Sequence, residues 1–268
     1  MLFGDGHILR SLLAHPLTRG MDLDDPQTTR LRQRIIAEKP FLRKVYEEWY
    51  RRLALALPAG TDAVLEIGSG AGFLNSLLPD VITSDVLFCP NVKIVLDATR
   101  LPFGNSSLRA ILITNVLHHV PEPRRFFSEA TRCVREGGVM AMIEPWVTPW
   151  SSLIYRVLHN EPFRPDSVDW EFPQAGPLSG ANNALPWMIF ERDRQQFERE
   201  FPEWKVQIIA PLMPVSYLLS GGVTLRSLMP GTGFNIFRRL ENLMQPVIKS
   251  WAMFAEIRLL RTSCTTST

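Results

Sequence analysis

The fold of this chain is decided by the stretch Val64-Leu65-Glu66-Ile67-Gly68-Ser69-Gly70-Ala71-Gly72. The apolar run predicts a buried parallel strand, and glycines directly after such a strand let the backbone turn tightly against a ligand. A dinucleotide-binding loop would need its third glycine at position 73, where this chain has Phe73. The Gly-Lys-Ser/Thr of a phosphate-binding loop is also missing. We therefore predict a nucleotide-type loop of a different kind.

A second β-branched run, residues 81–85, ends in Asp85. In a doubly wound sheet, ligands lie beyond the carboxyl ends of the strands, where a carboxylate can accept hydrogen bonds from two ribose hydroxyls. We expect this role for Asp85, in preference to the start of an ordinary turn. Only residues 73–80 remain for the crossover, with Pro79 near their end, so any helix there must be short.

Further strands are predicted at residues 110–115, 139–144, 204–210 and 253–261, with helices at 124–134, 151–160 and 192–201. Two histidines, His118 and His119, directly follow the strand that ends at Asn115, and Glu144 ends the next strand. Alternating strands and helices of this kind indicate an α/β protein with a largely parallel sheet.

The ordered motifs resemble those of the class I S-adenosylmethionine-dependent methyltransferases. The motifs are Glu66-x-Gly68-x-Gly70-x-Gly72, the acid Asp85, the segment 95–103 with Asp97 and Ala98, and the strand–Asn115–His–His segment. They are similar to the methyltransferase type 11 family, which includes ubiquinone and menaquinone C-methyltransferases and small-molecule O-methyltransferases. The resemblance covers about residues 63–144 and is weak elsewhere.

This resemblance implies a Rossmann-like, doubly wound sheet of seven strands whose last strand is antiparallel, and S-adenosyl-L-methionine as the cofactor. Asp97 would face the adenine amino group, and Ala98 would supply a backbone contact. The implied cofactor-binding residues are Glu66, Gly68, Ser69, Gly70, Gly72, Asp85, Asp97, Ala98 and Asn115.

The composition excludes several classes of protein. With 268 residues, 46% of them apolar, the chain can bury a substantial core, and a net charge of +2 gives little reason to expect nucleic acid. The cysteines Cys89, Cys133 and Cys264 are odd in number and scattered, so we expect a reducing cytoplasm and neither disulfides nor a zinc site. The longest apolar stretch, 206–223, contains two prolines and is too short for a transmembrane span.

Residues 1–58 form the predicted N-terminal helical extension, in which an amphipathic pattern from 28 to 57 is interrupted by Pro40. The methyltransferase domain would then span 59–261, with a cofactor half at 63–144, acceptor-side loops at 145–203 and an insert at 211–251. The tail 262–268 is expected to be disordered. The insert is rich in Leu, Met and Phe with scattered Arg and Lys. It could cap an apolar acceptor, rest on an anionic membrane surface or form an oligomer interface.

The candidate acceptor-binding residues lie outside the motifs. Tyr46 belongs to the extension, Trp146 and Trp150 follow the strand that ends at Glu144, and the loop 176–187 mixes polar and apolar residues. Packing alone could equally explain the aromatic residues, and turn formation could explain the polar ones. Trp49 and Tyr50 of the extension could line the pocket with Tyr46, and the candidates we select are Tyr46, Trp146, Trp150, Ser179, Asn182 and Asn183.

Methyl transfer needs few catalytic groups, because the sulfonium carbon is already activated and the protein chiefly positions the reactants. His118, His119 or Glu144 could remove an acceptor proton, although the histidines could instead shape the cofactor site. No cluster with metal-ligand spacing is evident in the sequence, so we expect no metal. The leading hypothesis is a small lipophilic acceptor, such as a quinone, isoprenoid, polyketide or lipid-linked sugar. The alternatives are a polar sugar or amino acceptor and a catalytically silent partner subunit.

Overall fold

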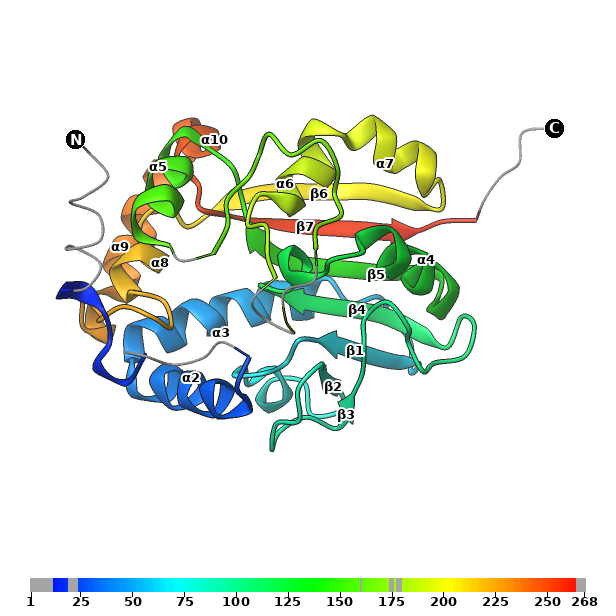
Figure 1. Ribbon diagram of the computed structural model, residues 1–268, viewed down its shortest axis with the longest axis horizontal. Helices are drawn as coiled ribbons and strands as arrows, with labels where there is room; N and C mark the ends of the chain where they lie inside the picture. The colour runs from blue at the N-terminus through cyan, green and yellow to red at the C-terminus, as the bar shows by residue number, and fades with distance from the viewer. Residues whose placement is uncertain (1–11, 19–23, 160, 174–175, 177–179, 264–268) are drawn as a thin grey trace.

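The computed structural model describes residues 12–18, 24–159, 161–173, 176 and 180–263. Seven strands form one sheet at its centre (Figure 1). The strands are β1 (Ala63–Ile67), β2 (Ile82–Asp85), β3 (Ile94–Val95), β4 (Leu108–Thr114), β5 (Val134–Pro145), β6 (Trp204–Leu212) and β7 (Phe254–Arg261).

The strand order is β3-β2-β1-β4-β5-β7-β6, and β1 to β5 pair in parallel. β7 is antiparallel to both β5 and β6 and lies between them. This arrangement confirms the predicted doubly wound fold with an antiparallel last strand. The chain leaves β1 toward β2 on one side and later returns to β4 on the other, so a crevice is expected beyond the ends of β1 and β4.

The helices before the sheet are α2 (Pro26–Glu38) and α3 (Pro40–Leu55), separated at Lys39. Proline is favoured at the first position of a helix and excluded from its interior, so Pro40 begins α3 as the sequence predicts. Between β1 and β2 there is only the 3₁₀ turn η2 (Leu74–Ser76), which confirms a short crossover.

The later helices are α4 (Pro123–Cys133), α5 (Pro149–Leu158), α6 (Leu185–Trp187), a π-helical turn η4 (Met188–Arg192) and α7 (Arg194–Glu200). The insert between β6 and β7 holds α8 (Ser216–Ser220), α9 (Phe234–Leu243) and α10 (Ile248–Trp251). Short 3₁₀ turns are η1 (Pro16–Thr18), η3 (Leu117–His119), η5 (Gly231–Gly233) and η6 (Gln245–Val247).

Two hydrophobic cores lie on opposite faces of the sheet. Leu65 and Ile67 of β1 belong to the core that includes residues of α4 and α7, whereas Val64 belongs to the core that includes residues of α3. The same alternation holds along β4 and β5, as expected where successive side chains point to opposite faces. Helices therefore cover both faces of the sheet.

The insert packs on the N-terminal helices at the end of the sheet where β5 leads into α5 (Figure 1). Lys39 donates hydrogen bonds from Nζ to the carbonyl oxygens of Gly222 and Leu225, at 2.5 and 2.8 Å. Arg238 of α9 forms ion pairs with Glu48 of α3 and with Glu241. These contacts fasten the insert to the extension.

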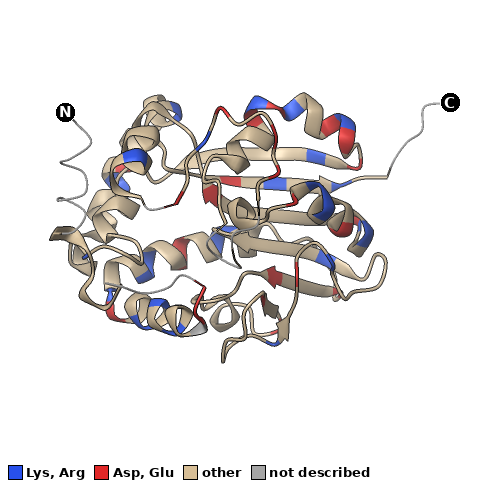
Figure 2. Ribbon diagram, viewed as in Figure 1, with Lys and Arg blue, Asp and Glu red and all other residues tan. Residues whose placement is uncertain are grey.

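The outer face of α9 carries exposed apolar side chains at Ile236, Leu240 and Leu243. Charged side chains of both signs follow one another along α3, α4 and α7 (Figure 2). Among the residues that the structure describes, no helix is long and apolar enough to cross a membrane.

Candidate active site

The glycine loop after β1 is held on both of its sides. Ser69 donates from its backbone N to the carbonyl oxygen of Ser84 at 2.7 Å, and its hydroxyl donates to Oε2 of Glu66 at 2.6 Å. Gly68 and Gly70 have backbone φ angles of +70° and +30°, which residues other than glycine rarely adopt. On the other side, a Cβ at Gly72 would lie 2.3 Å from the hydroxyl of Tyr50. The loop therefore follows β2 and α3 closely.

Asp85 lies at the carboxyl end of β2 and faces this loop. Its Oδ2 accepts a hydrogen bond from the backbone N of Gly70 and its Oδ1 accepts one from Leu87, both at 2.9 Å. Burial raises the pKa of Asp85, although the backbone hydrogen bonds oppose this. Each carboxylate oxygen retains capacity for a further hydrogen bond, which a ribose hydroxyl could donate.

Two polar atoms beside the loop have no hydrogen-bond partner within the described part of the chain. They are Oγ1 of Thr114 and Oδ1 of Asn115, both buried at the end of β4. Asn115 also has a φ angle of +57°, an uncommon conformation for a residue other than glycine. Buried polar groups are normally hydrogen-bonded, so these unpaired atoms fit a site that a polar ligand completes.

One cavity of about 300 Å³ runs along this edge of the sheet. Asp97 borders it, with Oδ1 accepting hydrogen bonds from the backbone and the hydroxyl of Thr99, both at 2.8 Å. The cavity is lined by every residue predicted to bind the cofactor: Glu66, Gly68, Ser69, Gly70, Gly72, Asp85, Asp97, Ala98 and Asn115. Their individual contacts with the cofactor stay predictions.

At its other end the same cavity meets His118, which lies in the turn after β4 and is buried. Its Nδ1 donates to Oε2 of Glu144 at 2.7 Å. The other oxygen of Glu144 accepts hydrogen bonds from the backbone N of Val116 and of Leu117, both at 2.8 Å. Glu144 is fully buried and both of its oxygens accept hydrogen bonds, so it positions His118 and this turn, and its role as a base stays a prediction.

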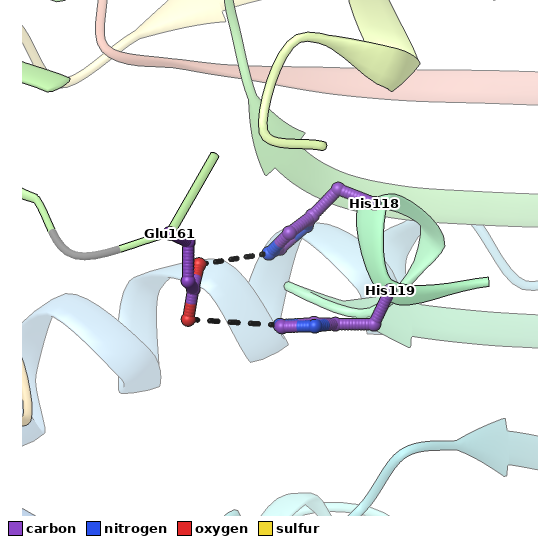
Figure 3. A group of neighbouring side chains, drawn as sticks. All are labelled: His118, His119 and Glu161. Carbon is purple, nitrogen blue, oxygen red and sulfur yellow. Dashed lines mark ion pairs between the residues drawn. The ribbon is translucent and has the colours of Figure 1, made fainter. Parts of the chain in front are cut away.

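His119 points into the cavity beside His118. Its Nδ1 donates to the carbonyl oxygen of Gly180 at 3.1 Å, which turns Nε2 toward Glu161. Glu161 lies in the stretch after α5 and faces both histidines (Figure 3). Its two oxygens are 3.7 Å from Nε2 of His118 and 3.9 Å from Nε2 of His119. One ligand atom from each of the three residues lies within 4.8 Å of the others, a spacing that could hold a metal ion.

The electrostatics of the two histidines differ. Burial opposes the charged form of His118, but the carboxylates of Glu144 and Glu161 outweigh it and raise its pKa to about 9. Burial and the neighbouring His118 lower the pKa of His119 to about 4, so this ring is neutral near pH 7. Burial would raise the pKa of Glu161, but the surrounding histidines hold it well below its usual value.

Some of the predicted acceptor-binding residues line the cavity and others do not. Tyr46 and Asn183 line the cavity, and Asn183 donates from Nδ2 to Oε2 of Glu161 at 3.1 Å. Asn182 is buried, and its Oδ1 accepts from the backbone N of Arg164 at 3.0 Å, so it shapes the loop. Ser179 lies outside the described residues.

The two tryptophans do not reach the described lining of the cavity. Trp146 is buried in the core on one face of the sheet. Trp150 donates from Nε1 to the carbonyl oxygen of Pro214 at 2.8 Å and packs against Trp251. In the described structure both side chains therefore serve packing, and their expected contact with an acceptor stays a prediction. Both follow β5 at the correct edge of the sheet, but a capping box at Thr148 starts α5 there and turns the chain away.

Some residues at the acceptor end were not predicted at all. Tyr155, Glu161, Tyr217 and Phe254 line the cavity, from α5, the stretch after it, the insert and β7. Glu161 follows a helix in an irregular stretch and belongs to no local motif. Tyr155 lies on the buried face of the amphipathic helix α5, and the sequence pattern shows that face. The pattern does not show that Tyr155 lines the cavity, because this depends on how α5 packs in the folded chain.

Residues 65–142 match the family model of the methyltransferase domain. Among solved structures, geranyl diphosphate C-methyltransferase from Streptomyces coelicolor is similar with a TM-score of 0.51 and 14% identity, over 93% of this chain and 90% of that chain. A chain in the complex of the Haloferax volcanii Trm112 methyltransferase activator with a methyltransferase has a TM-score of 0.52 and 12% identity, over 90% and 98%. No sequence of a curated protein matches the chain with significance.

At these identities the structural likeness shows the fold alone. The matched domain identifies the chain as an S-adenosylmethionine-dependent methyltransferase, and the glycine loop of the cavity is consistent with that cofactor. Its residues 65–142 carry the methyltransferase domain of the matched family.

The cofactor fits the cavity in three respects. Asp85 has free acceptor capacity, Asn115 and Thr114 offer unpaired buried oxygens, and the loop from Gly68 to Gly72 lines the cavity. When bound, S-adenosyl-L-methionine supplies an activated methyl group. These residues would hold the cofactor, and the part of the cavity beside His118 and His119 would remain for an acceptor.

Proposed function

We propose that this methyltransferase acts on a small lipophilic acceptor such as a quinone, isoprenoid, polyketide or lipid-linked sugar. The observation that carries the proposal is the character of the cavity beyond the cofactor loop. Aromatic side chains of Tyr46, Tyr155, Tyr217 and Phe254 border it there, beside the pair His118 and His119. Aromatic walls with a few convergent polar groups are typical of sites for small apolar molecules.

The aromatic wall is assembled from distant parts of the chain. Tyr217 of the insert stacks on Trp49 of α3 with ring centroids 5.6 Å apart and meets Phe254 edge to face at 4.6 Å. Tyr46 contacts the same Trp49 at 5.1 Å. These contacts fix the rings in place. Val223 and Thr224 of the insert also line the cavity, which favours the cap among the three readings of the insert.

The hydroxyl groups in this wall are neutral at ordinary pH. Burial raises the pKa of Tyr46 to about 12, and burial also raises the pKa of Tyr217. These side chains therefore present apolar rings and neutral hydrogen-bond donors, which suits an acceptor with a large apolar part and an oxygen function. His119 and Glu161 lie where such an oxygen could be held.

Methyl transfer in such a site depends on positioning. The cofactor's methyl group and the acceptor atom must meet in line at close range, and a cavity with an aromatic wall restricts the acceptor to few orientations. Polar groups at one end of the cavity orient the acceptor further, since an oxygen held there fixes which of its atoms faces the sulfonium.

The polar alternative also has an observation in its favour. Asn183, His119 and Glu161 gather at one point of the cavity and could bind the hydroxyl or amino groups of a sugar or amino compound. This set is small and lies against the aromatic wall, so we rank it second.

The test is to incubate the purified protein with methyl-labelled S-adenosylmethionine and an extract of host cells, and then to partition the label between organic and aqueous phases. Label in the organic phase supports the proposal. Label found only in the aqueous phase contradicts it and favours the polar acceptor. Cofactor binding without transfer to any extract fraction would favour a silent partner subunit.

A variant pair sharpens this test. Tyr217→Ala removes part of the aromatic wall and should reduce transfer to the organic-phase product at least tenfold, with cofactor affinity retained. Phe88→Ala removes an aromatic ring that is 71% exposed and lies outside the cavity lining, and it should leave transfer unchanged. Equal activity of both variants would contradict the aromatic wall as the acceptor site.

A further inference from the structure

Three side chains at the acceptor end of the cavity present nitrogen and oxygen atoms to a common point. They are His118 and His119 of the turn after β4 and Glu161 of the stretch after α5 (Figure 3). The separations of 3.7 and 3.9 Å between Glu161 and the two Nε2 atoms are longer than hydrogen bonds. Ligand atoms around a zinc ion, with bonds of about 2.0–2.2 Å, lie about 3–3.5 Å apart. The three ligand atoms lie within 4.8 Å of one another, so side-chain shifts of about 1 Å would bring them to this spacing around an ion.

Each of the three side chains has its own support. His118 donates from Nδ1 to Glu144 at 2.7 Å, and His119 donates from Nδ1 to the carbonyl oxygen of Gly180 at 3.1 Å. Glu161 accepts from Nδ2 of Asn183 at 3.1 Å. Metal-binding histidines characteristically donate their other ring N–H to a carboxylate or a backbone carbonyl, which fixes the tautomer and aims the free nitrogen at the metal. Both histidines have this arrangement here.

We propose that His118, His119 and Glu161 bind one divalent first-row transition metal ion, and that this ion holds an oxygen atom of the acceptor. The second half of the proposal rests on the proposed methyl transfer, whereas the metal site itself does not. Two imidazoles and one carboxylate are the ligand set of several zinc and iron sites that keep open coordination positions. Because all three residues line the cavity, the open positions would face the acceptor.

The charges around the site suit a dication. Glu161 would be a ligand, and Glu144 lies directly behind His118, so two carboxylates balance an ion of charge 2+. A balanced site avoids placing a net positive charge beside the sulfonium of the cofactor. Imidazole ligands favour zinc, iron, cobalt or nickel over magnesium, which prefers oxygen ligands and retains its water.

The site would select among acceptors. An ion at this point binds a hydroxylate, carbonyl or phosphate oxygen and leaves the apolar remainder of the molecule against Tyr155 and Tyr217. The acceptor would then be an amphiphile with an oxygen at one end. The same ion would fix the distance between that oxygen and the methyl group.

The first measurement is metal binding without cofactor or acceptor. The full chain is stripped with a chelator and titrated with Co²⁺ and Zn²⁺, with Mg²⁺ as the comparison ion. We expect one equivalent of Co²⁺ or Zn²⁺ per chain and weaker binding of Mg²⁺. X-ray absorption of the zinc-loaded wild-type protein should show imidazole nitrogen and carboxylate oxygen neighbours. No bound Co²⁺ or Zn²⁺, or sulfur neighbours from a cysteine, would overturn the proposal.

Variants locate the site. Glu161→Gln and His119→Gln should each weaken Zn²⁺ binding by more than about 100-fold, and Asn183→Ala by about 10–100-fold, since it removes only a support. His15→Gln changes a histidine outside the cavity lining and should bind Zn²⁺ as the wild type does. Thermal unfolding shows which variants are folded, and the absorption spectrum of the wild type decides the site without any variant. Equal affinity in folded His119→Gln and wild type would also overturn the proposal.

Methyl transfer is then measured in the same samples. Zinc bound at these residues with no transfer to any acceptor would leave the metal site standing and count against the proposed function. Transfer that continues at full rate in chelator-treated protein shown to be metal-free would support the function and overturn the role of the ion.

Discussion

The hydroxyl of Tyr50 lies directly against Gly72, where a Cβ would approach it to 2.3 Å. The same hydroxyl accepts a hydrogen bond from the backbone N of Phe73 at 3.2 Å. A residue of the N-terminal helix α3 therefore touches the end of the cofactor loop and fixes its path. The extension therefore helps to line the cavity and does not only cover the sheet.

Gly72→Ala should destabilise the protein by about 1–3 kcal/mol, because the new methyl group displaces Tyr50 or the loop. Denaturant unfolding measures this loss, and cofactor titration should show weaker binding. Gly104→Ala is the matched control, since its nearest neighbour would be the Cβ of Ser107 at 4.0 Å. Adding Tyr50→Phe to Gly72→Ala removes the hydroxyl and should recover part of the loss. If the effects of the two substitutions on the free energy of unfolding were strictly additive, the contact between Tyr50 and Gly72 would not determine the conformation of the loop.

Asp85→Ala should lower the affinity for S-adenosyl-L-methionine at least tenfold, a loss of about 1.4 kcal/mol, with the fold preserved. The reason is that its carboxylate faces the cavity and also orders the loop through Gly70. Isothermal titration calorimetry measures the affinity, and circular dichroism monitors the fold. Asp80→Ala removes an exposed carboxylate before β2 and serves as the control. Undiminished affinity in the Asp85 variant would mean that the ribose contact lies elsewhere.

The stability of the protein should depend on pH through Glu66. Burial raises the pKa of Glu66 from 4.5 to about 7, and the negative charge of Asp85 adds to this effect, while the hydrogen bond from Ser69 opposes it. Between these values the folded chain binds more protons than the unfolded chain does. The contribution of Glu66 to the free energy of unfolding is therefore present below pH 4.5 and lost as pH rises toward and through 7.

Glu66→Gln cannot ionise and should remove this dependence. The stability of the variant relative to the wild type should rise between pH 5 and pH 8, by at most about 3 kcal/mol. Denaturant unfolding at several pH values measures the difference. Glu136→Gln, on an exposed part of β5, controls for the loss of one carboxylate. A constant difference between Glu66→Gln and wild type across this range would contradict the raised pKa.

Arg238→Met should destabilise the protein by about 3–5 kcal/mol, since it leaves the buried carboxylate of Glu241 without a cation and leaves Glu48 with Arg52 alone. Thermal unfolding measures the loss. The neighbouring Arg239 is exposed, so Arg239→Met is a control on the same helix. Equal stability of the two variants would show that the insert is not fastened through Arg238.

The sequence predicted most of the cofactor half because its signals are local. The strand from Val64, the glycines after it and Asp85 each follow from neighbouring residues, and the sheet order follows from the resemblance. The short crossover could be predicted from the few residues between β1 and β2. The break at Pro40 could be predicted because proline is not tolerated in the interior of a helix.

The acceptor half could not be predicted in the same way. Glu161 reaches His118 and His119 only because the loop after α5 folds back over the sheet edge, and no spacing in the sequence shows this. Two adjacent histidines alone do not form a metal-binding motif in the sequence, and Glu161, the third residue of the cluster, is distant from them in the chain. Trp146 and Trp150 follow the correct strand but point into packing, because the direction of a side chain after a strand depends on the turn that follows. The cytoplasmic location stays a prediction.

The position of β7 has a consequence for the synthesis of the protein. β7 comes last among the strands yet lies between β5 and β6, and its first residue, Phe254, lines the cavity. Until residues 254–261 have left the ribosome, β5 has an open edge and β6 has no strand of the described sheet to pair with. Such edges are templates for aggregation. A nascent chain that stops before β7 would therefore be unable to enclose an acceptor and would depend on chaperones to remain unaggregated.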